Sequence, residues 1–564
     1  MHARFGWMIG FVLFACGGGA EVPVDAAPPI DAVMGGAQPP FPALVCPGAP
    51  ACATATGPLR VGAARVEITP SLTGFDTGWQ DLDGDHVYDS DEPYVDVNGN
   101  DRFDAVWIAG SQNARPMTGV HDPLWARAIV FDQGDERIAV VVYDLIGWFI
   151  DDMDATRAML PASLGIDHVI FAATHSHQSP DTMGLWGRTS LETGVDSDYN
   201  QRVRALTVEA LTAAVAGLEP VTMTMAKVAT VDGVGATAPY VSDLRDPIVL
   251  DPTLTLARFA AAADPDRTVA TLVHWAAHPE YVGFDNNLVS SDVVHYIRDT
   301  IERGAPASAA GGAEPGLGGV AVYLQGAVGG QIGPWGTRPI AADGTAIDRE
   351  GFARAEAAGV NVGRLGLEAL SRAGAEDVAA PALGFRTGQL LVRVENVFYH
   401  VGALVGVFDR QLVGYDPSQA ISDSNMPYVP SRVSYLSLGP LAIITAPGEL
   451  HPELFVGGYD GSASYGVPIV SSDNPNPPRL GDAPPPPYLR DRMLAAPGVR
   501  YPLVAGLAED TLGYILPRWN FELSPTSPYL EEADGDHYEE TNSVGPTAEV
   551  EIVGAMAALI GWRP

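Results

Sequence analysis

From about residue 61 onward, the chain alternates between short apolar runs and longer segments in which apolar residues recur at helical spacing. The runs are rich in β-branched residues and predict buried strands at 137–143, 168–173, 268–275, 320–324 and 441–445. The longer segments predict helices near 200–217, 291–303, 350–372 and 546–560. This alternation predicts an α/β protein with mixed β-sheets and flanking helices in a single large domain.

Several of the predicted strands end in polar residues, namely Asp144, His175 with His177, His278, Gln325 and Glu449. In open α/β sheets, ligands bind at the carboxyl ends of strands, so this recurrence indicates a site. If the extended geometry of 168–173 continues, His175 and His177 project to the same face. Two imidazoles would then point at one spot, as a catalytic metal site requires. A His-x-His pair is short, however, and two ordinary surface or core histidines would fit it equally well.

Composition narrows the class of protein. The chain has 564 residues, of which 46% are hydrophobic and 18% charged, as in a folded globular protein. Its formal net charge of −37 argues against nucleic-acid binding, a phosphate-binding surface or electrostatic attraction to anionic lipid.

The N-terminus predicts export. Arg4 precedes an apolar stretch, and Cys16 is followed by three glycines, so residues 1–16 resemble a bacterial lipoprotein signal. In such signals the cysteine is lipidated, which would give this chain a membrane anchor at Cys16; ordinary secretion is the alternative, because Phe14 fits the pattern poorly. The expected location is the bacterial cell envelope or the outside of the cell.

Residues 17–58 are rich in Pro, Ala and Gly and predict a flexible tether that precedes a catalytic domain over 59–564. Cys46 and Cys52 lie near the end of the tether. In an exported protein they favour a short disulfide, with zinc binding as the alternative.

An acidic insertion at 81–104 contains two loops with the ligand spacing of an EF-hand-type Ca²⁺ loop. The carboxylates of the first loop stand at positions 1, 3, 5, 9 and 12, and are Asp81, Asp83, Asp85, Asp89 and Glu92. The second loop repeats the pattern with Asp96, Asn98, Asn100 and Asp104. Position 6 holds His86 or Asp101 in place of the usual glycine, so the turn is expected to differ. The loops predict structural Ca²⁺, against the alternative of a merely solvated acidic surface.

Further motifs follow the His-x-His pair in a fixed order. They are the stretch 274–280 around His278, the segment 446–449 that ends in Glu449, the segment 513–515 around Tyr514, and the segment 537–539 around Tyr538. Together with 61–70 and 119–128, they resemble the catalytic domain of the neutral/alkaline (non-lysosomal) ceramidase family over about residues 61–560. The resemblance implies a zinc-dependent amidohydrolase that converts an N-acyl lipid such as N-acylsphingosine into a sphingoid base and a fatty acid.

The resemblance also implies residue roles. Zinc would be ligated by His175, His278, Glu449 and Tyr514, with a water in the remaining position. His177 would hydrogen-bond that water or the substrate, and Tyr538 would help polarise the scissile carbonyl. This chemistry is coherent, since zinc lowers the pKa of its water to about 7 and an imidazole can carry the proton to the leaving amine.

The chain departs from the family at one loop. The family has a Gly-Asp-Val-Ser-Pro-like segment, whereas this chain has Gly330 at the aspartate position and Ile332 at the serine position. Gln331 is a candidate hydrogen-bond donor to the substrate instead, and Arg245 is a candidate for the family's substrate arginine. Two alternatives therefore stay open: a metallohydrolase of another amide or an ester, and a non-catalytic, Ca²⁺-stabilised surface lipoprotein with the same fold.

Overall fold

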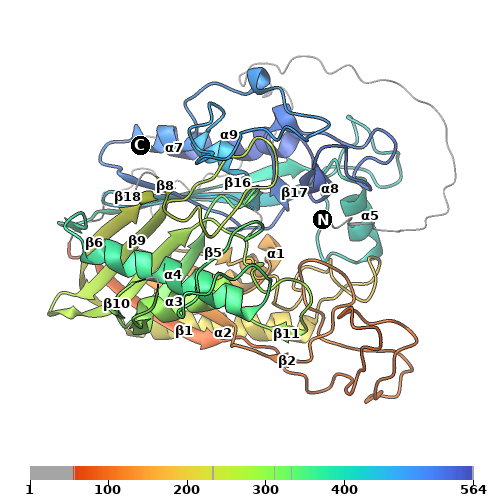
Figure 1. Cartoon of the computed structure of the whole chain (residues 1–564), viewed down its shortest axis with the longest axis horizontal. Helices are drawn as coiled ribbons and strands as arrows, with labels where there is room; N and C mark the ends of the chain where they lie inside the picture. The colour runs from red at the N-terminus through yellow and green to blue at the C-terminus, as the bar shows by residue number, and fades with distance from the viewer. Residues whose placement is uncertain (1–54, 56, 232–233, 310, 332, 562–564) are drawn as a thin grey trace.

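The computed structural model describes residues 55, 57–231, 234–309, 311–331 and 333–561. Two β-sheets pack face to face, and helices cover the outer face of each sheet (Figure 1). The predicted fold class, a single large domain of mixed sheets and flanking helices, is confirmed.

The larger sheet contains nine strands within the described residues, in the order β14-β10-β9-β6-β1-β3-β4-β5, with β15 paired to β6. Two pairs, β10 with β14 and β4 with β5, are parallel, and the others are antiparallel. The strands are β1 (Arg60–Glu67), β3 (Trp125–Gln133), β4 (Glu136–Tyr143), β5 (His168–Ala173), β6 (Glu219–Val228), β9 (Leu254–Ala261), β10 (Asp264–Trp275), β14 (Val320–Gln325) and β15 (Glu376–Val378).

The second sheet has the order β16-β17-β18-β20, and only its last pair is parallel. Its strands are β16 (Leu383–Arg393), β17 (Tyr428–Leu438), β18 (Leu441–Thr445) and β20 (Tyr501–Ala505). Short two-stranded pairs complete the strands of the described chain: β2 (Gly119–Val120) with β11 (Leu288–Val289), β7 (Thr230–Val231) with β8 (Val234–Gly235), β12 (Gly304–Ala305) with β13 (Glu314–Pro315), and β19 (Glu449–Leu450) with β21 (Tyr514–Ile515).

The long helices lie on the outer faces of the two sheets. On the larger sheet these are α2 (Ser197–Ala216), α3 (Val293–Arg303) and α4 (Phe352–Ser371), while α9 (Thr547–Gly561) lies on the second sheet. The shorter helices are α1 (Ile150–Ala158), α5 (Val397–Val405), α6 (Pro452–Val456), α7 (Leu489–Leu494) and α8 (Tyr538–Thr541). Among the described residues, no helix has the length and apolar character needed to cross a bilayer.

Three apolar layers hold the domain together. The central one lies between the sheets, where Phe131, Ile170 and Phe259 of the larger sheet meet Phe385 and Ile443 of the second. The outer layers pack the helices onto the sheets. The strands at 168–173 and 441–445 have the predicted bounds, and the other predicted strands and helices are confirmed to within a few residues at their ends. Continuous apolar runs predicted the strands because both faces of the sheets are buried, and helical spacing predicted the helices because each buries one face.

Candidate metal centre

Five side chains from four separate segments meet at the carboxyl ends of strands. His175 and His177 follow β5, His278 follows β10, and Glu449 and Tyr514 are direct register partners in the parallel pair β19–β21. The ring centroid of His175 lies 4.9 Å from that of His177 and 4.8 Å from that of His278. The three histidines offer nitrogen atoms that all lie within 4.8 Å of one another, so together they can hold a metal ion.

The two histidines after β5 converge for a reason other than the predicted one. The strand ends at Ala173, and His175 has a φ of 69°, in the left-handed region. The expectation that the extended geometry continues is therefore wrong. The turn is held by the backbone amides of His175 and Ser176, which both donate to the carbonyl of Leu145 at 2.9 and 3.2 Å. A backbone strained in this way is characteristic of functional sites.

Gln325 holds two of the strand ends together. Its side-chain amide donates to the carbonyl of Thr174, next to His175, at 3.0 Å, and to the carbonyl of Ala277, next to His278, at 2.8 Å. Its side-chain oxygen accepts from the backbone amide of Ala277 at 3.2 Å. This buried glutamine, which the sequence marked only as a polar strand end, thus fixes the spacing between His175 and His278.

Backbone carbonyls set the orientation of His175 and His278. Nδ1 of His175 lies 2.6 Å from the carbonyl oxygen of Ile146, and Nδ1 of His278 lies 3.1 Å from that of Gln331. A carbonyl oxygen can only accept, so each Nδ1 must carry the proton and donate. In the neutral imidazoles, both Nε2 atoms then present lone pairs to the centre, which is the arrangement found at metal sites.

Glu449 places a further acceptor between these two nitrogens. Its Oε2 lies 3.1 Å from Nε2 of His278 and 3.4 Å from Nε2 of His175. Burial raises the pKa of Glu449, but the two histidines outweigh it and hold the pKa well below its ordinary range. Burial lowers the pKa of His278, but Glu449 and Glu280 outweigh it, so the pKa is raised above its ordinary value. Since neutral imidazole nitrogens and a carboxylate are all acceptors, the arrangement is balanced either by a cation at its centre or by a proton on one of the imidazoles.

Tyr514 and Tyr538 form one wall of the centre. The hydroxyl of Tyr514 lies 3.5 Å from Nε2 of His278, and the Tyr514 side chain is buried. Burial and the charge of Glu449 raise the pKa of Tyr514 well above its ordinary value. The ring of Tyr538 packs edge-on against that of Tyr514 at 5.7 Å, and Tyr538 is 43% exposed. Tyr538 thus lies between the buried centre and solvent.

His177 has a carboxylate partner that the sequence reasoning did not single out. Oε1 of Glu280 lies 2.5 Å from Nδ1 of His177. Burial lowers the pKa of His177 to about 4 even though Glu280 opposes the shift. Neither ring nitrogen of His177 has a hydrogen bond of good geometry among the described residues, so Glu280 is in close contact with Nδ1 and Nε2 is free. A neutral imidazole with a carboxylate beside one nitrogen and the other nitrogen free can act as a base. The sequence feature that could have indicated this partner is the position of Glu280, two residues after His278.

A glycine makes room for this histidine. Gly110 has a φ of 109°, and a Cβ at this position would lie 2.7 Å from Cβ of His177. The backbone of Gly110 therefore fits against the imidazole only without a side chain.

The loop at 325–334 contributes through its backbone. Both ends of the Gln331 side chain are bonded inside the protein: Nε2 donates to the carbonyl of Ala327 at 2.7 Å, and Oε1 accepts from the amide of Asp251 at 3.3 Å. Its part in the centre is the carbonyl that orients His278. A Cβ on Gly330 would lie 2.8 Å from Oδ1 of Asp243, so a carboxylate from another segment occupies the space beside this glycine. Ile332 lies outside the described residues.

Arg245 is buried beside α8, and its guanidinium forms hydrogen bonds within the protein. Its guanidinium donates to Glu540 at 2.7 and 2.8 Å, to Glu539 at 3.1 Å and to the carbonyl of Asn520 at 2.6 Å. The structure does not bring Arg245 to the three histidines. Instead, its contacts fasten the segment that carries Tyr538.

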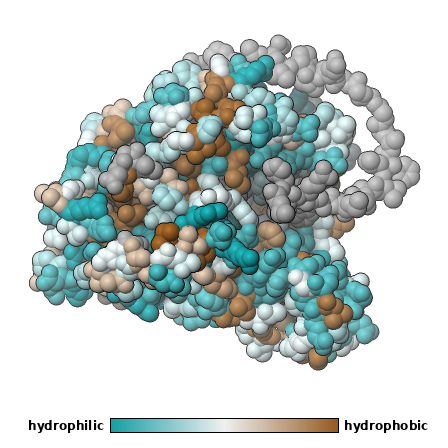
Figure 2. All heavy atoms as spheres, viewed as in Figure 1, coloured by the Kyte–Doolittle hydropathy of each residue, from teal (hydrophilic) through white to brown (hydrophobic). Residues whose placement is uncertain are grey.

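The acidic insertion forms two similar loops. The ligand atoms of Asp81, Asp83 and Asp85 all lie within 4.8 Å of one another, a spacing that can hold a cation. In the second loop, Asp104 accepts from the side-chain amides of Asn98 and Asn100 at 2.8 and 2.7 Å. Glu92 accepts from the backbone amides of Leu82 and Asp89, and Asp96 accepts from that of Gly99. At the lower right of Figure 2, where this insertion lies, a few apolar residues stand among hydrophilic ones.

The expectation that the turn at position 6 differs from the EF-hand type is wrong. His86 has a φ of 66° and Asp101 a φ of 59°, so both adopt the left-handed conformation that glycine usually supplies. The amide of His86 donates to Asp81 at 3.0 Å, and that of Asp101 to Asp96 at 2.9 Å. These equivalent hydrogen bonds offset the cost of placing a residue with a Cβ in this region.

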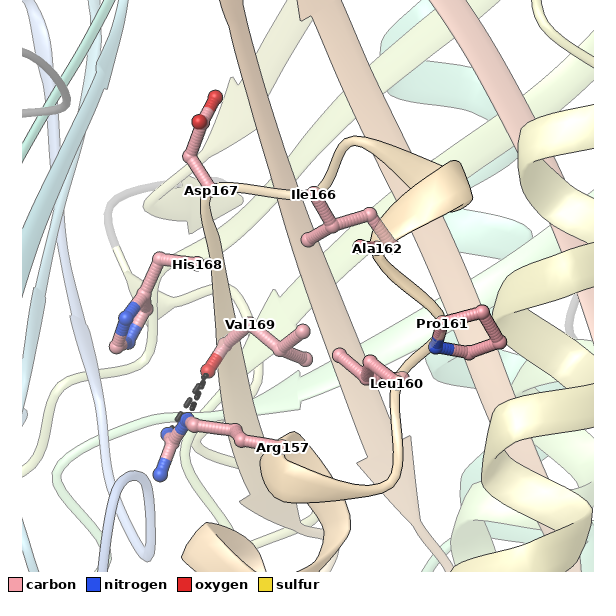
Figure 3. Close-up of a pocket in the computed structure, with 8 residues that line it drawn as sticks. All are labelled: Arg157, Leu160, Pro161, Ala162, Ile166, Asp167, His168 and Val169. Carbon is pink, nitrogen blue, oxygen red and sulfur yellow. Dashed lines mark hydrogen bonds between the residues drawn. The ribbon is translucent and has the colours of Figure 1, made fainter.

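A surface pocket lies at the opposite end of β5, around Arg157, Asp167 and His168 (Figure 3). Arg157 donates to the carbonyl of Val169, as the figure shows, and also to Glu509. The polar side chains of this pocket are paired with groups of the protein: Arg157 and His168 with Glu509, and Asp167 with the backbone amide of Arg137.

Some of the sequence predictions fall outside the described residues. These are the signal at 1–16, the lipidation of Cys16, the pairing of Cys46 with Cys52 and nearly all of the tether.

Comparisons with known proteins bear on the fold. No protein-family model and no curated protein matches the sequence. Among solved structures, the chain is similar to a neutral ceramidase from Pseudomonas aeruginosa, with 15% identity and a TM-score of 0.55 over 89% of this chain and 74% of that chain. It is also similar to a structure described as a ceramidase complexed with C2, with the same identity and TM-score, over 89% of this chain and 75% of that one. The chain therefore has a ceramidase-like fold, as the sequence resemblance implied.

Proposed function

We propose that this chain is a zinc-dependent hydrolase of the amide bond in a ceramide-like N-acyl lipid. The observation that carries the proposal is the meeting of acceptors at the centre: Nε2 of His175 and Nε2 of His278 both face Oε2 of Glu449, at 3.4 and 3.1 Å. Their Nδ1 atoms donate to backbone carbonyls, so the Nε2 lone pairs and the carboxylate can bind one cation together. The ceramidase-like fold supports the choice of substrate.

The donor set fits zinc, which takes imidazole nitrogen and carboxylate oxygen as ligands. His175, His278, Glu449 and Tyr514 would hold the ion. When bound, zinc would supply Lewis-acid polarisation of the scissile carbonyl and a water with a pKa of about 7.

The remaining groups handle protons and orientation. His177 would accept a proton from the attacking water at Nε2 and deliver it to the leaving nitrogen as the C–N bond breaks, which releases a carboxylic acid and an amine. Glu280 would hold the proton on Nδ1 of His177 and stabilise the imidazolium that forms. Tyr538, at the exposed edge of the centre, would donate a hydrogen bond to the carbonyl oxygen.

The proposal is tested by zinc analysis of the purified protein and by release of fatty acid from N-acylsphingosine and simpler N-acyl amines. We expect one zinc per chain, no zinc in the His175→Ala variant, and zinc retention with a loss of about 10²–10⁴ in rate for His177→Ala. His121→Ala, which alters a partly exposed histidine against Phe352, is the matched control and should keep both zinc and rate. Zinc-free protein, or an unchanged rate after His177→Ala, contradicts the proposal.

A second candidate is the hydrolysis of another amide or an ester. The observation that favours it is the loop at 325–334, where the family's aspartate and serine positions are Gly330 and Ile332. The same panel extended to esters separates the two candidates, because both depend on His177 but differ in the preferred leaving group.

We also propose that the acidic insertion binds Ca²⁺ with a structural role. The clustering of Asp81, Asp83 and Asp85 and the left-handed turns at His86 and Asp101 support it. Calorimetry should show uptake of Ca²⁺ that Asp83→Asn weakens, with zinc content unchanged. No uptake by the parent protein would rule it out. Export and a lipid anchor at Cys16 remain proposals, which mass spectrometry of the mature N-terminus tests.

A further inference from the structure

Helix α5 (Val397–Val405) presents an apolar face to solvent. Val397, Val401, Leu404 and Val405 are 47%, 43%, 64% and 57% exposed. They stand at positions i, i+4, i+7 and i+8, which form one stripe along a helix. A stripe of this kind usually faces a core, and the helix contains no Asp, Glu, Lys or Arg to interrupt it.

The other side of α5 is fastened to the metal centre. Asn396, the N-cap of α5, donates through its side-chain amide to the carbonyls of Thr541 and Ser543, close after Tyr538, at 3.0 and 2.9 Å. The hydroxyl of Tyr399 lies 3.2 Å from the position that a Cβ of Gly513 would take, and the carbonyl of Gly513 accepts from the amide of Glu449 at 2.9 Å. In Figure 1, α5 accordingly lies beside α8 at the right-hand edge of the molecule.

Apolar side chains connect the helix to the histidines. Phe408 packs edge-on against Tyr399 of α5 at 5.6 Å and against Phe149 at 6.3 Å. Phe149 belongs to a small apolar cluster with Ile146, whose carbonyl accepts from His175. Packed apolar side chains therefore link the inner side of α5 to the neighbourhood of the metal centre, so the exposed stripe and the centre belong to one packed unit.

We propose that the exposed face of α5 rests on the surface of an uncharged or zwitterionic lipid bilayer and positions the metal centre to take its substrate from that surface. The proposal rests on the proposed function for the identity of the substrate. The net charge of the chain favours a neutral bilayer as the partner of this face. A net charge of −37 repels both an anionic bilayer and a second copy of the chain. Apolar side chains on a helix that has no Lys or Arg suit the interface of a neutral bilayer.

The test uses the full chain carrying Cys16→Ser, so that no lipid anchor contributes, and vesicles of phosphatidylcholine alone. Co-sedimentation should show binding by the parent protein and a fall of about tenfold or more for Val401→Ser with Leu404→Ser, because both side chains would be buried on binding. The matched control is Met159→Ser with Leu494→Ser, which alters two residues that are 44% and 46% exposed elsewhere on the surface. The control should bind as the parent does.

Activity gives a second readout. The α5 variant should lose hydrolysis of an N-acyl lipid embedded in vesicles by the same factor, and keep within about twofold its hydrolysis of a short, water-soluble N-acyl amine. Failure of the parent to bind vesicles, or equal binding by the α5 variant, overturns the inference. A parent dimer that the α5 substitutions disperse also overturns it, in favour of a second copy as the occupant. Because sedimentation needs no catalysis, α5-dependent binding by an inactive protein would support the inference while the proposed function fails.

Discussion

The two ends of strand β5 each place a histidine next to a buried glutamate, but the charge of the glutamate is balanced in different ways. At the start of the strand, His168 lies 2.9 Å from Glu509, which also pairs with Arg157 and accepts from Ser434 at 2.6 Å. Past the end of the strand, Glu449 has only His175 and His278 as ion-pair partners among the described residues.

A structural ion pair differs from a candidate metal site in whether its positive charge is permanent. Burial raises the pKa of Glu509, but Arg157 and His168 outweigh it and hold the pKa well below its ordinary range. An arginine cannot lose its proton, so that pair is complete within the protein. The histidines beside Glu449 donate hydrogen bonds from Nδ1 to backbone carbonyls, and unlike an arginine they carry no permanent positive charge. Only a bound cation or an extra proton balances the charge there.

The strongest way to test this contrast is to remove the charge of Glu449. Glu449→Gln should abolish zinc retention and lower the rate of hydrolysis by more than about 100-fold. Even the mutation of a residue that only supports a metal ligand typically lowers metal affinity or activity by about 10–100-fold. Metal analysis and initial rates measure the two effects. A variant that keeps its zinc would show that Glu449 is not needed to hold the ion.

The same substitution at the other end of β5 should have the opposite profile. Glu509→Gln removes the buried carboxylate that Arg157 and His168 face, while Arg157 keeps its pairing with Asp154, so the free energy of unfolding should fall by about 1.5–3 kcal/mol. Zinc content should be unchanged, because Glu509 does not contact the centre. Urea unfolding gives the free energy of unfolding. If Glu509→Gln lost zinc while remaining folded, the two ends would not be independent.

Glu280 tests the contrast within the centre itself. Its close contact is with His177, although its charge also raises the pKa of His278. Glu280→Gln should retain zinc and lower kcat by about 10–100-fold, through a less well oriented and less basic His177. Asp285→Asn removes a nearby exposed carboxylate and should leave kcat unchanged. A variant with full kcat would show that the 2.5 Å contact between Glu280 and His177 has no part in turnover.

The sequence predicted the elements and the fold because hydrophobic period is a local signal that each strand and helix carries by itself. It also indicated His175, His278 and Glu449, since each follows a recognisable strand or motif. It could not give the left-handed turn at His175, which depends on hydrogen bonds to Leu145 from a neighbouring segment. For the same reason, the pairing of His177 with Glu280 was not visible. The hydrogen bonds of Arg245 could not be predicted either, because its partners lie almost 300 positions away in the sequence.

The smallest expected effect is a pH dependence that appears only when the metal is removed. In the metal-free protein the pKa of His278 is raised, with Glu449 and Glu280 outweighing the burial that lowers it. A raised pKa in the folded state stabilises the fold below the unfolded value of about 6.5, and this stability is lost as pH rises through the folded value. Chelator-treated protein should therefore melt a few degrees lower at pH 9 than at pH 6, with a weaker dependence when zinc is bound. Glu449→Gln should flatten the dependence, because it removes a principal cause of the raised pKa. An equal slope in the chelator-treated parent and in Glu449→Gln would mean that the carboxylate and the imidazole are not coupled, and would remove the basis for contrasting the two ends of β5.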